Sequence, residues 1–245
     1  MKELYVFGNY SPNLKGKPGS CYYLNGFKMP ILLDFGTRNY KLVKEKIDLQ
    51  NLNEIMIIIS HNHADHLFGI FRLLNKLVKN NKKITVFMPA KGFMFRILNT
   101  IYSNKVDIKP LNEKTEFLIE GHKFSFCRTP HSVESYATKI ENGIKSFIYT
   151  SDIFDIDDNL KKFCNGVDVV LIDSGIPEKS EKISLKGYHG ETKYILNSFF
   201  RDDCNVKRVY ASHLKAKVPD EQYFNIFPKD KDITLIKMGN SYDIL

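Results

Sequence analysis

The sequence predicts a layered α/β protein, and two observations carry this prediction. Short apolar runs rich in β-branched residues recur along the chain and are typical of strands. Between them lie segments whose apolar residues repeat at helical spacing. Mixed strands with helices packed outside them are typical of layered α/β folds.

The first third of the chain predicts mainly strands. They are expected at 4–7, 21–24, 31–34 and 55–60, with a helix near 40–47. A second helix is expected after residue 66, because Leu67, Ile70 and Leu74 fall on one face and Arg72 and Lys76 on the other.

The remainder alternates strands and helices. Strands are expected at 84–88, 124–127, 136–140, 146–149, 167–172, 206–211, 233–237 and 242–244, and helices at 92–102 and 192–199. The turn Glu141-Asn142-Gly143 predicts a hairpin between two of these strands.

The segment His61-Asn62-His63-Ala64-Asp65-His66 is the most informative part of the sequence. It places three imidazoles and a carboxylate directly after an apolar run, in a chain that has only 7 histidines. Imidazole and carboxylate bind borderline divalent metals, and a strand end fixes their positions. A His-rich surface loop is the alternative, but it does not explain this concentration. We predict a metal site.

Residues of the same kinds follow other strands. They are Asp34, His131, Asp152 and His213. The ordered set, with its His-x-His-x-Asp-His segment, resembles the motifs of the metallo-β-lactamase-fold hydrolases. That resemblance implies a four-layer αββα sandwich. Because the matching residues span both halves of the chain and no Pro-, Gly- or Ser-rich linker separates them, we expect one hydrolase domain over residues 1–245.

The resemblance also implies the ligands of two divalent metal ions. The first ion is assigned to His61, His63 and His131, the second to Asp65, His66 and His213, and Asp152 bridges them. Such ions make hydroxide available from water near neutral pH. Zinc is the expected metal. Manganese or iron are alternatives because the ligand set contains no cysteine.

Two aspartates receive further roles. Asp65 is predicted to be a catalytic residue as well as a ligand. Asp34 is expected to hydrogen-bond a ligand or the motif loop, and the alternative is a capping role in the turn Asp34-Phe35-Gly36.

His189, just before a predicted helix, is the second predicted catalytic residue. In phosphodiesterase members of the family, including ribonuclease Z, a His at a similar place faces the scissile phosphate. There it stabilises charge or protonates the leaving group. The alternative is a surface His at a helix start. His122, by contrast, is assigned to a turn before a strand and is expected to have no function.

The residues after His131 favour phosphodiester hydrolysis. The run His131-Ser132-Val133-Glu134-Ser135-Tyr136 resembles the corresponding run of ribonuclease Z relatives. Departures are Ala64 and Ser151, where glycine is common, and a short interval between His131 and Asp152 that leaves no room for a long tRNA-gripping arm. The predicted substrate is therefore a small-molecule or short single-stranded nucleic-acid phosphodiester, such as a cyclic nucleotide or an RNA end.

Two other functions stay open at this point. An ester, thioester or lactone hydrolase of glyoxalase II or lactonase type would use the same metals and leave His189 incidental. The second open function is that of a non-hydrolytic protein, either a metal-binding accessory protein or a di-iron redox protein. Zinc-dependent β-lactamases are disfavoured because they commonly use a cysteine at the position of Asp152 and carry a signal peptide.

Composition adds expectations about location and partners. The formal net charge of +8 suggests nucleic acid, but the basic residues are scattered as on an ordinary solvated surface. The start of the chain lacks signal-peptide features, and the four cysteines have no CxxC spacing. We expect a cytoplasmic protein with reduced core thiols and no membrane association, and leave a homodimer open. The loops at 9–19 and 178–188 are expected to set substrate choice, and Lys215 and Lys217 could reach a substrate phosphate.

Overall fold

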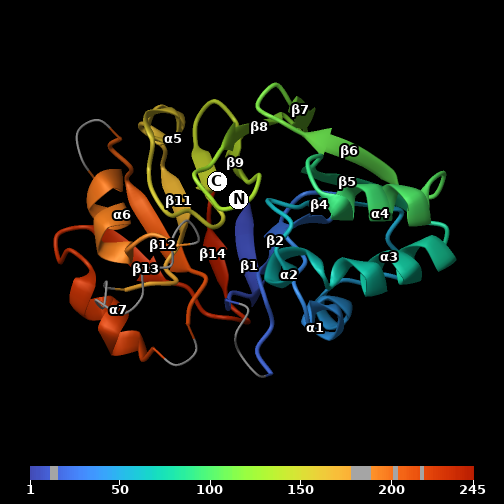
Figure 1. Ribbon diagram of the computed structural model, residues 1–245, viewed down its shortest axis with the longest axis horizontal. Helices are drawn as coiled ribbons and strands as arrows, with labels where there is room; N and C mark the ends of the chain where they lie inside the picture. The colour runs from blue at the N-terminus through green and yellow to red at the C-terminus, as the bar shows by residue number, and fades with distance from the viewer. Residues whose placement is uncertain (12–15, 178–188, 201–203, 216–217) are drawn as a thin grey trace. The chain divides into compact units, whose positions relative to one another are not determined.

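Two seven-stranded mixed sheets organise the structure, a computed structural model that describes residues 1–11, 16–177, 189–200, 204–215 and 218–245 (Figure 1). The chain splits into two compact units. Unit 1 contains Met1–Leu111 and Met238–Asp243, and unit 2 contains Asn112–Lys237 and Ile244–Leu245. The units are described separately, and the expectation of one domain stays a prediction.

The sheet of unit 1 has the order β14-β1-β2-β3-β4-β5-β6. Its strands are β1 (Glu3–Gly8), β2 (Cys21–Asn25), β3 (Ile31–Leu33), β4 (Glu54–Ile58), β5 (Lys83–Pro89), β6 (Asp107–Leu111) and β14 (Ser241–Asp243). Strands β3 to β6 are parallel neighbours, so their carboxyl ends lie at one edge of the sheet. That edge carries the predicted metal motif.

Helices cover one face of this sheet (Figure 1). They are α1 (Asn39–Lys46), α2 (Ala64–Leu67), α3 (Ile70–Lys79) and α4 (Phe93–Tyr102). Alternate residues of β4 pack with Leu74 and Leu77 of α3, all of them nearly or fully buried. The helix predicted after residue 66 is therefore confirmed, although it is divided into α2 and α3.

The sheet of unit 2 has the order β13-β12-β11-β10-β9-β8-β7. Its strands are β7 (Glu116–Ile119), β8 (His122–Arg128), β9 (Tyr136–Glu141), β10 (Ser146–Tyr149), β11 (Val169–Asp173), β12 (Arg208–Ser212) and β13 (Asp232–Leu235). The predicted hairpin is the antiparallel pair of β9 and β10. Strands β10 to β13 are parallel, which again brings several carboxyl ends to one edge.

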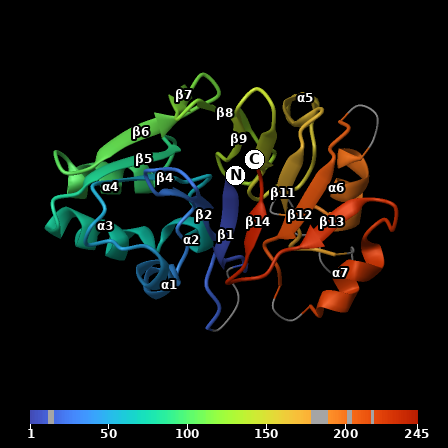
Figure 2. The ribbon, with the colours of Figure 1, turned by 180° about the vertical axis from the view of Figure 1, so that it is seen from behind.

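Helices α5 (Asp158–Cys164), α6 (Thr192–Phe199) and α7 (Asp220–Ile226) lie beside this sheet (Figure 2). Ile195, Leu196 and Phe199 of α6 form a core with Ile148 of β10 and Val170 of β11. Helix α6 has the predicted bounds. Helices α5 and α7 and strands β6 and β7 were not predicted.

The four cysteines are buried thiols, as expected for reduced core residues. Within the described ranges, no helix has the length and apolar character needed to cross a bilayer.

Helix α5 begins with a capping bond that can be tested. Asp157 has extended backbone angles, and its carboxylate accepts a 2.8 Å hydrogen bond from the Leu160 N–H. Asp157→Ala removes this acceptor and is expected to lower the free energy of unfolding by about 1 kcal/mol. The measurement is urea denaturation, and Asp157→Asn is the matched control because asparagine also caps. An unchanged midpoint for Asp157→Ala would contradict the assignment.

Candidate metal centre

The predicted metal motif follows β4 in unit 1 and runs into helix α2. His63 has extended backbone angles and precedes the helix, whereas Asp65 and His66 lie inside it. The helix turn brings these side chains back toward those of His61 and His63. The strand end and the helix start thus fix all four side chains locally.

Three imidazoles and one carboxylate come together within unit 1. The Nε2 atom of His61 lies 3.0 Å from Nδ1 of His63, and the ring centroids of His61 and His66 are 4.2 Å apart. The Nε2 atom of His66 lies 3.6 Å from a carboxylate oxygen of Asp65. His61, Asp65 and His66 are buried. This donor set fits a borderline divalent cation.

Asp34 holds the motif in place. Its buried carboxylate accepts hydrogen bonds from the Ser60 N–H at 2.7 Å and the Ser60 hydroxyl at 2.8 Å, and it lies 2.7 Å from Nδ1 of His66. The Ser60 hydroxyl in turn lies 3.0 Å from Nδ1 of His61. The expectation that Asp34 bonds a ligand or the motif loop is confirmed. With both Nδ1 atoms engaged, Nε2 is the ring nitrogen that His61 and His66 could offer to a metal.

The backbone of the motif is packed against three glycines. A Cβ on Gly19 or Gly36 would lie 2.3 or 1.8 Å from the Asp65 carbonyl oxygen, and one on Gly69 would lie 2.2 Å from the Gly36 oxygen. The same Asp65 oxygen accepts a 2.8 Å hydrogen bond from Ser20. Glycine is required here because only it permits these approaches. Of the predicted substrate loop at 9–19, residues 12–15 lie outside the described residues.

Unit 2 gathers a second group of ligands at its strand ends. Ligand atoms of Asp152, Asp173, His189 and His213 all lie within 4.8 Å of one another. Asp152 follows β10, Asp173 ends β11 and His213 follows β12, and these strands are parallel neighbours. The predicted Asp152, His189 and His213 are thus brought together. The whole of the predicted loop at 178–188 and Lys217 lie outside the described residues.

Asp173 is a site residue that the sequence analysis missed. Its carboxylate lies 2.6 Å from Nδ1 of His189 and 3.3 Å from Nδ1 of His213, and it accepts a hydrogen bond from the Gly175 N–H. The available signal was an aspartate directly after the apolar run of β11, the pattern that identified Asp34 and Asp152.

His189 is buttressed by two carboxylates. Besides Asp173, an oxygen of Asp152 lies 3.8 Å from its Nδ1. Burial opposes protonation, but the charges of Asp173 and Asp152 outweigh burial and raise the pKa of His189. Burial also opposes ionisation of Asp173, yet the charge of His189 outweighs it and lowers the pKa of Asp173 to about 2. A surface role at a helix start is wrong for His189, because its side chain is only 10% exposed.

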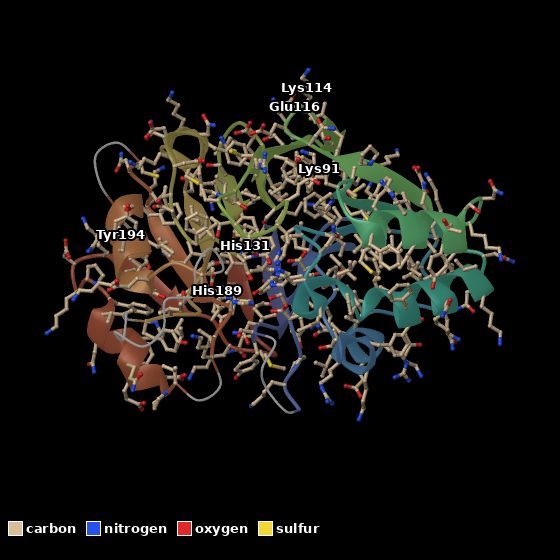
Figure 3. All side chains as sticks on the ribbon, in the orientation of Figure 1. Lys91, Lys114, Glu116, His131, His189 and Tyr194 are labelled. Atoms are coloured by element: carbon tan, nitrogen blue, oxygen red, sulfur yellow. The ribbon has the colours of Figure 1, made fainter. Side chains whose placement is uncertain are left out.

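His131 follows β8 and faces the same region of unit 2. Its ring centroid lies 6.3 Å from that of His189 (Figure 3). A 2.9 Å hydrogen bond from Thr129 to the Ser135 oxygen closes its loop. By contrast, His122 is the first residue of β8 rather than part of the turn before it, and its Nδ1 lies 2.9 Å from the carbonyl oxygen of Glu120 in that turn.

Three residues in or next to the two groups of candidate metal ligands have left-handed backbone conformations. Their φ angles are 58° for Asp34, 58° for Ser151 and 56° for His213. Such angles are uncommon outside glycine and are found where the surroundings enforce them, often at functional sites. The left-handed conformation of Ser151 also explains why glycine is common at this position in the family that the sequence resembles.

The profile of a family described as "Beta-lactamase superfamily domain" matches residues 33–214. The chain belongs to this superfamily. The matched segment includes every residue assigned above to the metals. The sequence-based prediction of the family is confirmed.

Two curated relatives match part of this chain. Ribonuclease J2 of Bacillus subtilis (strain 168) is 28% identical over 178 residues, which cover 62% of this chain and 31% of the ribonuclease. Hydroxyacylglutathione hydrolase of Buchnera aphidicola is 32% identical over 108 residues, which cover 42% of this chain and 41% of that protein. The chain therefore spans well under half the length of either relative.

Solved structures of this superfamily have the same fold. The metallo-β-lactamase fold protein YhfI from Bacillus subtilis matches with a TM-score of 0.83 at 16% identity, over 98% of both chains. A diphosphatase from the PhnP family matches with a TM-score of 0.77 at 16% identity, over 98% of this chain and 96% of the other. The short form of human tRNase Z gives 0.74 at 14% identity over 99% of both chains. The predicted αββα fold of metallo-β-lactamase type is confirmed.

The role of Asp34 can be tested through metal affinity. Asp34→Asn keeps the shape of the side chain but replaces one carboxylate oxygen with an NH₂ group, which then faces groups that now donate hydrogen bonds to the carboxylate. This favours the His66 tautomer with its proton on Nε2, which cannot bind a metal. We expect Zn²⁺ affinity to fall about 10- to 100-fold, measured by competition with a chromophoric chelator. Asp48→Asn, in an exposed turn, is the control. Equal affinities of both variants and the unmodified protein would refute the orienting role.

Proposed function

We propose that this protein is a metal-dependent phosphodiesterase that acts on a small or single-stranded phosphodiester. The observation that carries the proposal is the buried pairing of His189 with Asp173, at 2.6 Å, beside Asp152 and His213. A pair of this kind suits an acid that donates a proton to a poor alkoxide leaving group.

The proposed metal ligands are those given by the family resemblance. His61, His63 and His131 would hold one ion, Asp65, His66 and His213 a second, and Asp152 would bridge them. When bound, such ions lower the pKa of water from about 15.7 toward 7 and offset negative charge on phosphate oxygens. The donor set of imidazoles and carboxylates fits zinc best, with manganese or iron as alternatives.

Side chains of the protein would donate and accept the protons of the proposed reaction. Asp173 accepts a hydrogen bond from Nδ1 of His189, so Nε2 is the atom that would face the substrate. The charges of Asp173 and Asp152 raise the pKa of His189, which favours the charged imidazole that would stabilise phosphate charge or protonate the leaving oxygen. Asp65, buried beside His66, would accept the proton of the attacking water.

The relatives agree with this proposal to different extents. Ribonuclease J2, the diphosphatase from the PhnP family and tRNase Z favour a phosphate substrate. The hydroxyacylglutathione hydrolase favours a second candidate function, hydrolysis of a thioester or another carboxylic ester with the same metals. In that second case the leaving group would not need the acid supplied by His189.

Metal removal and reloading tests the activity itself. Protein stripped by a chelator is expected to lose hydrolysis of bis(p-nitrophenyl) phosphate and to regain it with Zn²⁺ or Mn²⁺, because nucleophile formation depends on the cation. Release of p-nitrophenol is the readout, and the same protein reloaded with Mg²⁺ is the control. Two bound ions per chain without turnover would overturn the proposal and favour the ester candidate.

His189 separates the two candidate functions. His189→Ala is expected to lower kcat for phosphodiesters with alkyl leaving groups by about 10²- to 10⁴-fold, through loss of the general acid. His189→Asn should be equally impaired although it keeps a donor for Asp173, so the loss cannot be attributed to an unpaired carboxylate. His122→Ala is the matched control with no expected effect.

These variants are compared by steady-state kinetics on a phosphodiester and on a thioester. Unchanged phosphodiester turnover in both His189 variants would rule out the acid role. A parallel loss of thioester turnover in the two His189 variants would also rule out the acid role.

A further inference from the structure

Phe154 is an exposed aromatic residue on the loop that carries Asp152. It lies two residues after Asp152, and its side chain is 41% exposed. The preceding Ile153 is completely buried in the helix-side core of unit 2, whereas Phe154 is not part of that core. Single exposed apolar residues are common, so the argument depends on what surrounds this one.

The backbone around Phe154 is fixed by the loops that carry the site histidines. Its N–H donates a 3.0 Å hydrogen bond to the oxygen of Pro130, the residue before His131. The oxygen of Ile153 accepts a 2.8 Å hydrogen bond from Gly190, the residue after His189. Phe154 is therefore held where the loops of His131 and His189 meet.

Gly190 is required for this arrangement. A Cβ at this position would lie 2.5 Å from the Phe154 oxygen and 2.7 Å from Cδ1 of Ile195. No other residue could let the His189 loop approach so closely. The chain thus keeps an aromatic ring in contact with solvent on a rigid segment beside the proposed acid and a proposed metal ligand.

We propose that Phe154 stacks on a planar ring of the substrate, so that the preferred substrates are phosphodiesters that carry a nucleobase. This inference rests on the proposed phosphodiesterase function. Aromatic side chains bind bases through their π-faces regardless of base identity.

The test compares two substrates that share a leaving group. Thymidine 5′-(p-nitrophenyl phosphate) carries a base, and methyl p-nitrophenyl phosphate does not. Phe154→Ala is expected to raise KM for the thymidine substrate about tenfold, with kcat unchanged, because one stacking contact is lost. Both parameters should stay unchanged for the methyl substrate, which also verifies that the variant is folded.

Two further variants sharpen the result. Phe154→Tyr keeps the ring and should restore KM. Tyr194→Ala removes an aromatic residue that is 50% exposed on α6, away from His131 and His189, and should change nothing (Figure 3). Equal losses on both substrates, or no loss on either, would overturn the stacking role. If the unmodified protein hydrolyses neither substrate with any metal, the proposed function itself fails.

Discussion

A buried aspartate at a strand end organises each unit. Asp34 follows β3 in unit 1 and Asp173 ends β11 in unit 2, and both are nearly inaccessible to solvent. A buried carboxylate is tolerated only when hydrogen bonds or opposite charge offset its lost hydration. Each aspartate meets this requirement with backbone N–H groups and an imidazole. In each unit, the hydrogen bond that the buried carboxylate requires therefore fixes the orientation of a histidine ring.

The sequence identified most of this site because the ligands follow simple strand patterns. A strand that is apolar on both faces reads as a continuous hydrophobic run, and a polar residue just beyond it lies at the sheet edge. This pattern found Asp34, the motif from His61 to His66, Asp152 and His213. Asp173 obeys it too, but it carries no motif of its own, and its partner His189 is distant in sequence. The hydrogen bond between them is visible only in three dimensions.

The missed strands lack a long apolar run. Strands β6 and β7 are the outer strands of their sheets and are largely exposed or half-buried; β6 has no apolar run, and that of β7 is limited to Phe117, Leu118 and Ile119. β6 also contains Pro110, a residue confined to edge strands because it cannot donate a ladder hydrogen bond. Helices α5 and α7 have only 7 residues each, too few for a clear helical period.

In the proposed function the same aspartate–histidine pairing would serve different chemistry in the two units. An imidazole that binds a metal must be neutral, with a lone pair on the outer nitrogen. Asp34 engages Nδ1 of His66, so Nε2 is the nitrogen of His66 that would bind a metal in the proposed site. His189 has two carboxylates near one nitrogen, which favours the charged form. A charged imidazole cannot be a metal ligand but can donate a proton, which is the role proposed for His189.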